Sequence, residues 1–187
     1  MRMNFGMKNW MYPMPVLMIG TYNEDGTANV MNAAWGGILG ADLIAICVDE
    51  SHKTTENIKA RKAFTVAFAD EAHVVEADYL GIVSGNDVLD KLERAGLHAS
   101  KSNLVDAPII EEFPMAFECE MISYDDETEI LMGRIVNLSA DESILDESHN
   151  IDYQKFSPIT YDPVNHKYIK LGDVVGNAFC DGQKIDE

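Results

Sequence analysis

Residues 15–35 read PVLMIGTYNEDGTANVMNAAW, and this stretch decides the fold class. Residues 15–22 are rich in apolar and β-favouring side chains, and residues 23–26, Asn-Glu-Asp-Gly, are turn formers. Residues 27–35 then follow the two-residue period of a strand. The stretch therefore predicts a β-hairpin, and the paired glycines at 36 and 37 predict the end of its second strand.

The rest of the chain continues in short strands and short helices. Few connections have the strand–helix–strand pattern of a parallel sheet, which favours a mainly β, antiparallel barrel with helical insertions. Gly133, inside the strand predicted at residues 129–138, predicts a bulge or a barrel bend. No internal repeat or long linker divides the chain, so residues 1–187 are expected to form one domain. The further strands are predicted at residues 39–48, 63–69, 116–124 and 129–138, and the helices at 52–62, 71–82 and 87–95.

The charge of the chain excludes two classes of partner. Its 32 acidic residues outnumber 14 Lys and Arg, which gives a formal net charge of −18. Such a surface repels the phosphates of nucleic acids and the anionic face of a membrane. We therefore expect neither nucleic acid nor membrane as a partner.

Cysteine and apolar patterning point to a cytoplasmic protein. The three cysteines are more than sixty residues apart, which suggests neither a disulfide framework nor clustered metal ligands. The longest apolar stretch, residues 37–48, is interrupted by Asp42 and is too short to cross a bilayer. Residues 1–12 lack the apolar run and cleavage site of a signal peptide. The five histidines show no zinc-hydrolase spacing, so no metal site and no catalytic residue are assigned.

One candidate binding site lies at residues 49–58, DESHKTTENI, where a predicted strand ends and a helix begins. The free amides and positive dipole of a helix N-terminus favour an anion such as phosphate. Ser51, Thr54 and Thr55 would add hydroxyl donors, and Lys53 would add an ammonium group. The alternative is an ordinary capped helix with a solvated lysine.

A second candidate site lies at residues 29–37, NVMNAAWGG. Small residues followed by paired glycines would let a flat ligand lie against backbone amides, with Trp35 as a wall. The alternative is ordinary barrel packing with a bend at the glycines. Asn32, on an otherwise apolar strand, needs a hydrogen-bond partner, which is either a ligand or a neighbouring loop.

Four segments in order resemble one known family over residues 15–179. These are PVLMIGTYNEDGTANVMNAAW, DESHKTTENIKARKAFTVAF, DYLGIVSGNDVLDKLERAGL and YIKLGDVVGNAF. They resemble the flavin reductase-like family with the FMN-binding split barrel, and within it the flavoredoxins most of all. The resemblance implies a six-stranded antiparallel split barrel and a homodimer that holds FMN noncovalently near the subunit interface.

The resemblance also implies which residues contact the cofactor. The family's flavin-contacting strand matches Asn32, Ala33, Ala34 and Trp35, and its phosphate-binding segment matches Ser51, His52, Lys53 and Thr54, with Asn57 nearby. Lys91 comes from a family segment beside the flavin, and Tyr168 and Phe179 come from the C-terminal segment.

The activity implied is that of an FMN-binding oxidoreductase. It would take electrons from NADH, NADPH or a protein donor and pass them to flavin or another acceptor. No acid or base of the protein is required, because hydride transfer is the chemistry of the cofactor. The alternative is a flavoredoxin-type electron carrier, in which the acidic surface docks a basic redox protein. A third possibility is a barrel that serves as an interaction module, because fold constrains function weakly.

Overall fold

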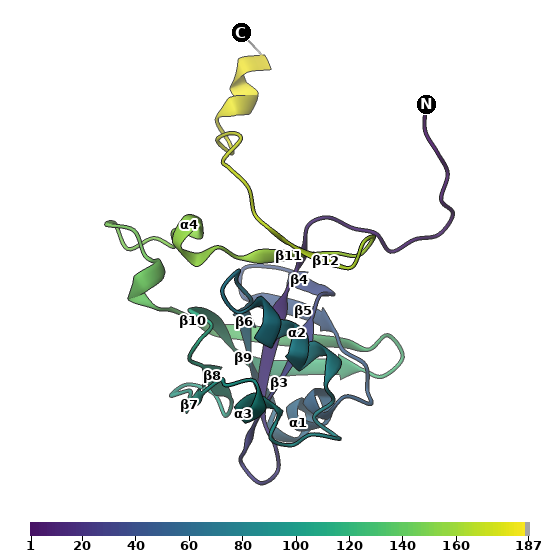
Figure 1. Ribbon diagram of the computed structural model, residues 1–187, viewed down its shortest axis with the longest axis vertical. Helices are drawn as coiled ribbons and strands as arrows, with labels where there is room; N and C mark the ends of the chain where they lie inside the picture. Colours follow the sequence, from purple (N-terminus) through teal and green to yellow (C-terminus); the bar gives the residue numbers. More distant parts are fainter. Residues whose placement is uncertain (186–187) are drawn as a thin grey trace.

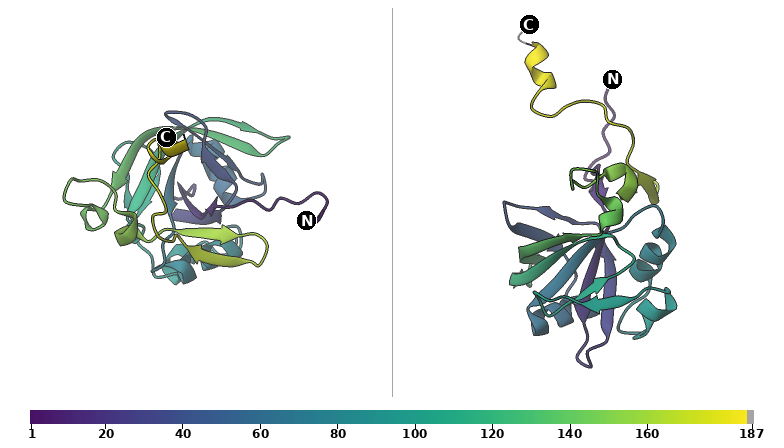
Figure 2. Two further views of the ribbon diagram at one scale, coloured as in Figure 1. Left: turned by 90° about the horizontal axis from the view of Figure 1, so that it is seen from above. Right: turned by 90° about the vertical axis from the view of Figure 1, so that its left-hand side faces the viewer.

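A seven-stranded antiparallel sheet forms the body of the protein (Figure 1). The computed structural model describes residues 1–185. Across the sheet lie β3 (Ala28–Ala33), β2 (Leu17–Tyr22), β6 (Ala63–Phe68), β9 (Met115–Asp125), β10 (Ile130–Ala140), β5 (Leu43–Cys47) and β4 (Gly36–Ile38). The sheet curls into a half-barrel (Figure 2). The predicted mainly β, antiparallel barrel is confirmed, with β4 as a strand beyond the six expected.

The first hairpin forms where the sequence predicts it. β2 and β3 are antiparallel, with Leu17 opposite Ala33. In the turn, the Asn23 amide donates to the Thr27 carbonyl at 2.9 Å, and Gly26 adopts a φ of +86° that favours glycine. The hairpin brings the end of β3, with Asn32 and its neighbours, to one edge of the sheet.

The paired glycines after β3 differ from the prediction. Gly36 and Gly37 continue the sheet as β4, and β5 starts at Leu43, four residues later than expected. A Cβ on Gly36 would lie 3.0 Å from the Ala45 carbonyl oxygen, so glycine lets this edge strand approach its neighbour closely. Glycine has a low intrinsic preference for strands, but the pairing of these residues with β5 outweighs that preference.

The core lies on both faces of β6. Phe64 and Val66 belong to one buried apolar cluster and Ala67 to another, as expected for a central strand. A Cβ on Gly133 would lie 2.4 Å from the Phe64 ring, and the β9–β10 register shifts between Met132 and Gly133. The predicted bulge is therefore confirmed, and its glycine makes room for the core aromatic ring.

Three helices appear where helical stretches are predicted, with shorter bounds. They are α1 (Lys53–Arg61), α2 (Val74–Ile82) and α3 (Lys91–Arg94). The chain also contains α4 (Tyr153–Phe156) and the 3₁₀ helices η1 (Glu142–Ile144) and η2 (Asp181–Ile185). α2 and α3 contact β3 and pack with Met18 in one buried cluster, whereas Ile58 of α1 packs with Ile19 in the cluster on the other face of β2. Among the described residues, every helix is too short or too polar to cross a membrane.

A second hairpin, late in the chain, lies beside α2. β11 (Ile159–Asp162) pairs with β12 (Lys167–Lys170) and with β1 (Met14–Pro15), while β7 (Ala99–Lys101) pairs with β8 (Pro108–Ile110). In the β11–β12 turn, the Asp162 carboxylate accepts from the amides of Val164 and Asn165 and from the Asn165 side chain. Residues 1–12 and 172–185 extend away from the barrel at the same end (Figures 1 and 2).

Candidate functional site

The turn between β5 and α1 presents the N-terminus of the helix. Both the amide and the hydroxyl of Ser51 donate to Asp49 Oδ1, at 2.8 and 2.5 Å, and these bonds lower the pKa of Asp49. His52 occupies the N-cap position with extended backbone, and its side chain makes no capping hydrogen bond to the described residues. The first backbone N–H groups of α1 have no acceptor within the helix, so they are available to an external acceptor.

A cavity of about 200 Å³ lies against this end of α1. Its lining includes His52, Lys53, Thr54 and Lys91 but no aspartate or glutamate among the residues that the structure describes. The acid-free lining stands out in a chain with 32 acidic residues. The cavity therefore suits a small anion. The full lining is Met31, Asn32, His52, Lys53, Thr54, Leu80, Gly81, Ile82, Val83, Ser84, Gly85 and Lys91.

The two lysines of this cavity are held differently. Lys53 pairs with Glu56 at 2.9 Å, and its side chain is 18% exposed. Lys91 is 2% exposed, and its Nζ donates to the carbonyls of Val83 at 3.0 Å and Leu80 at 3.4 Å. Burial lowers the pKa of Lys91 to about 8. The Lys91 ammonium thus stabilises the carbonyl end of α2 and retains a third N–H for a ligand.

A larger cavity of about 420 Å³ adjoins the first, and the two share Asn32, Gly81 and Ile82 in their linings. Its full lining is Asn32, Ala33, Ala34, Asp78, Gly81, Ile82, Tyr161, His166 and Tyr168. The small residues at the end of β3 and Gly81 on α2 leave room for a flat molecule. Asn32 Nδ2 donates to the Ala77 carbonyl at 3.0 Å, so α2 supplies the partner that this polar side chain needs.

Tyr168 and Asp78 form a hydrogen-bonded pair at the larger cavity. The Tyr168 hydroxyl donates to Asp78 Oδ1 at 2.8 Å and accepts from Asn32 Nδ2 at 3.5 Å. Burial, together with the Asp78 carboxylate, raises the pKa of Tyr168 to about 12. Tyr168 therefore stays neutral at physiological pH and fixes the position of the Asn32 amide.

Eight of the predicted cofactor residues line the two joined cavities, although their contacts with a cofactor stay a prediction. They are Asn32, Ala33, Ala34, His52, Lys53, Thr54, Lys91 and Tyr168. The β2–β3 hairpin, α1, α3 and β12 bring these residues together from distant parts of the chain.

The other four predicted residues do not line these cavities. Asn57 is buried and donates to Thr21 Oγ1 and Asn23 Oδ1, so its amide ties α1 to the first hairpin. The Ser51 hydroxyl is engaged by Asp49, and the Trp35 side chain is 54% exposed. Phe179 is fully exposed in the C-terminal segment that extends from the barrel.

Sequence reasoning missed Asp78, Gly81, Tyr161 and His166, which all line the larger cavity. Gly81 carried a usable signal, because a glycine inside a helix costs stability and often marks close packing. A Cβ on Gly81 would lie 3.1 Å from the Asn32 Cβ. The other three lie on elements whose approach to β3 leaves no local pattern in the sequence.

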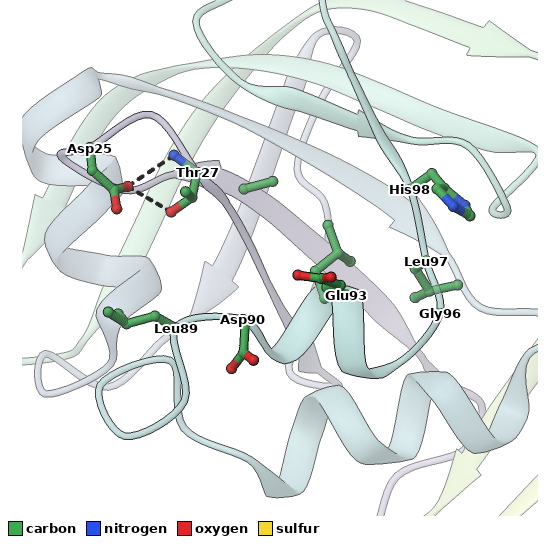
Figure 3. Close-up of a pocket in the computed structure, with 10 residues that line it drawn as sticks. Asp25, Thr27, Leu89, Asp90, Glu93, Gly96, Leu97 and His98 are labelled. Atoms are coloured by element: carbon green, nitrogen blue, oxygen red, sulfur yellow. Dashed lines mark hydrogen bonds between the residues drawn. The ribbon is translucent and has the colours of Figure 1, made fainter.

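A further cavity of about 340 Å³ lies by α3 and the first turn. Figure 3 shows Asp25, Asp90 and Glu93 around it, with Asp25 hydrogen-bonded to Thr27. These carboxylates would repel a phosphate group. An anionic ligand therefore fits the acid-free cavity at α1 and not this one.

Comparison with known proteins identifies the family. The model of the flavin reductase-like domain matches residues 7–163. The chain therefore belongs to the flavin reductase-like family, and the resemblance read from the sequence is confirmed.

Solved structures share the fold over nearly the whole chain. Flavoredoxin of Desulfovibrio vulgaris (Miyazaki F) is 35% identical with a TM-score of 0.93, covering 97% of this chain and 100% of that chain. Flavoredoxin from Methanosarcina acetivorans is 26% identical with a TM-score of 0.87, covering 98% and 100%. The 2-nitrobenzoate 2-nitroreductase NbaA of Pseudomonas fluorescens is 23% identical with a TM-score of 0.79, covering 95% of both chains, and shows the fold alone.

Proposed function

We propose that the protein binds FMN noncovalently across the two joined cavities and acts as an FMN-dependent oxidoreductase. Its electrons would come from NADH, NADPH or a protein donor and pass to flavin or another acceptor. The observation that carries the proposal is the acid-free cavity with two lysines at the N-terminus of α1, joined to a cavity with small residues at the end of β3. FMN matches both cavities, because its phosphate is anionic and its ring system is flat.

The residues present fit the cofactor. The first-turn amides of α1, Lys53, Thr54 and the third N–H of Lys91 would hold the phosphate. Asn32, Ala33 and Ala34 would lie along the ring system. Bound FMN supplies hydride transfer, and the protein binds and orients it. Within this arrangement Tyr168 holds the Asn32 amide, and Gly81 keeps α2 close to β3.

A spectroscopic titration tests this function. Apoprotein is titrated with FMN, FAD and riboflavin, and the loaded protein is then reduced anaerobically with NADH or NADPH. We expect a flavin spectrum, tighter binding of FMN than of riboflavin, and bleaching by a reduced nicotinamide. Bound FMN that neither nucleotide bleaches would reject direct reduction by nicotinamides, and failure to bind FMN would reject the whole proposal.

The second candidate function is an electron carrier without turnover of a small substrate. Two observations favour it, the net charge of −18 and the 35% identity to a flavoredoxin. An acidic carrier docks a basic redox protein by electrostatic attraction, which salt screens. Transfer to a basic protein such as cytochrome c should then slow steeply as ionic strength rises, and a rate independent of salt would count against the carrier.

A homodimer would cover the apolar chain ends. Residues 1–12 carry Arg2 and Lys8 and no acidic residue, which complements the acidic surface of a second copy. Their exposed apolar residues are Met1, Met3, Phe5, Met7, Trp10, Met11 and Tyr12. An apolar segment of this length is a typical contact surface.

Sedimentation equilibrium tests the dimer. The full chain should run at about twice its mass of 20.8 kDa, and a variant that lacks residues 1–12 should dissociate at a higher concentration. A full chain that stays monomeric at all concentrations would reject the dimer. The FMN titration does not depend on this outcome.

A further inference from the structure

The β11–β12 hairpin places three aromatic side chains at the larger cavity. Tyr161, His166 and Tyr168 all line it, and we call them the aromatic wall. The ring centroids of Tyr161 and Tyr168 are 6.1 Å apart, and those of Tyr161 and His166 are 6.3 Å apart. Such spacing is that of aromatic rings in contact with one another, so the three side chains form one continuous surface at the cavity. The proposed function uses only Tyr168 of this wall.

His166 is held in a fixed orientation. Its Nδ1 lies 2.8 Å from the Tyr161 hydroxyl, and its backbone has a φ of +54° in a turn that the Asp162 carboxylate stabilises. With Nδ1 engaged, Nε2 is the ring nitrogen left for a ligand, since the described residues give it no partner. His166 is exposed, so solvent protons reach it.

The charges around His166 favour a neutral ligand with an oxygen acceptor. The titratable groups that line the same cavity are Asp78, Tyr161 and Tyr168. Asp78 accepts the Tyr168 hydroxyl and is the carboxylate of this lining, so it disfavours an anionic ligand. The imidazole is the basic group of the lining and, when protonated, donates a hydrogen bond to an oxygen.

We propose that the aromatic wall binds a neutral quinone or related aromatic carbonyl compound as electron acceptor, and that His166 protonates its oxygen. This inference rests on the proposed function, because singly deprotonated reduced FMN is the reductant. One oxygen of the quinone takes the hydride, which carries two electrons and one hydrogen, and the other takes the proton of the imidazolium. The products are hydroquinone, oxidised flavin and neutral imidazole, which solvent reprotonates. His166 then acts as a general acid.

A comparison of two acceptors tests this assignment. Protein loaded with FMN is reduced by dithionite and mixed anaerobically with 1,4-naphthoquinone or with ferricyanide, which takes electrons without a proton. His166→Asn keeps a residue that tolerates positive φ. We expect it to slow naphthoquinone reduction about 100-fold, as loss of a general acid does, and to leave ferricyanide reduction unchanged.

The matched control is His149→Asn. His149 is also exposed with a positive φ of +62°, but it does not line the described cavity. This variant should match the wild type with both acceptors. An unchanged naphthoquinone rate in His166→Asn, or an equal slowing with both acceptors, would overturn the role of His166.

Binding gives a readout independent of turnover. Calorimetric titration of oxidised, FMN-loaded protein with 1-naphthol should show about threefold weaker binding for His166→Asn, the value of one hydrogen bond. Equal affinity for wild type and variant would contradict the subsite. The flavin spectrum of each sample separates the two proposals, because a wild type that fails to load FMN rejects the function itself, whereas loaded protein without these effects rejects only this inference.

Discussion

The two joined cavities differ in both their chemistry and the elements that build them. The smaller cavity lies where β5 leads into α1, and its lysines and helix amides select negative charge. The larger cavity lies between the end of β3 and the late β11–β12 hairpin, and it offers small and aromatic surfaces to a planar molecule. Under the proposed function, the smaller cavity would discriminate FMN from riboflavin, whereas the larger one would bind their common ring system.

Lys91 should give the largest effect on FMN affinity, through pH. Its pKa of about 8 means that the amine is charged below pH 8 and neutral above it. A bound phosphate favours the charged form, so above pH 8 binding must take up a proton and FMN affinity must fall. Between pH 8, where half of the amine is already neutral, and pH 9.5 we expect a loss of about 15-fold, by proton linkage, in equilibrium titrations with FMN.

Two comparisons isolate the lysine in this experiment. Lys91→Met should remove the pH dependence over the same range, and riboflavin affinity of the wild type should stay flat because riboflavin has no phosphate. A wild type whose FMN affinity is constant up to pH 9.5 would show that Lys91 does not face the phosphate.

Asn57 should affect folding and not ligand discrimination. Its amide donates to Thr21 and Asn23, and Asn57→Ala would leave the buried Asn23 oxygen without this donor. We expect a loss of about 1–3 kcal/mol in the free energy of unfolding, measured in urea. The FMN-to-riboflavin affinity ratio should stay at the wild-type value. A lowered affinity ratio would instead show that Asn57 contributes to the phosphate site, as the sequence resemblance implies.

Tyr168→Phe should give the smallest effect and should act on both ligands alike. The change removes the hydroxyl that links Asp78 and Asn32 at the larger cavity. One such hydrogen bond is worth about 0.5–1.5 kcal/mol, so FMN and riboflavin should each bind roughly threefold more weakly. If only FMN binding weakened, the assignment of the ring system to this cavity would be wrong.

The sequence predicts the hairpin and the helix N-terminus because both depend on local residues. Turn formers at 23–26 and the start of α1 near His52 follow from backbone preferences over a few positions. Gly133 is predictable for the same reason, since a glycine inside a strand marks a local irregularity.

The remaining parts of the site depend on tertiary contacts. Asn57 lies only three residues from Thr54, yet its partners Thr21 and Asn23 lie more than thirty residues away, and no local pattern shows them. The β11–β12 hairpin likewise approaches α2 through contacts between residues distant in sequence. This approach brings His166 to the cavity that Asn32 lines. Long-range packing decides which way such side chains point, so spacing along the chain cannot reveal it.

The most direct test of the phosphate site is the ratio of FMN to riboflavin affinity in Lys53→Ala. Lys59→Ala is the matched control, since Lys59 lies on the same helix but pairs with Asp126 and does not line the described cavity. We predict that Lys53→Ala lowers the ratio about tenfold, the value of a charged hydrogen bond, and that Lys59→Ala leaves it unchanged. An unchanged ratio in Lys53→Ala, or an equal fall in both variants, would contradict a phosphate site at the start of α1.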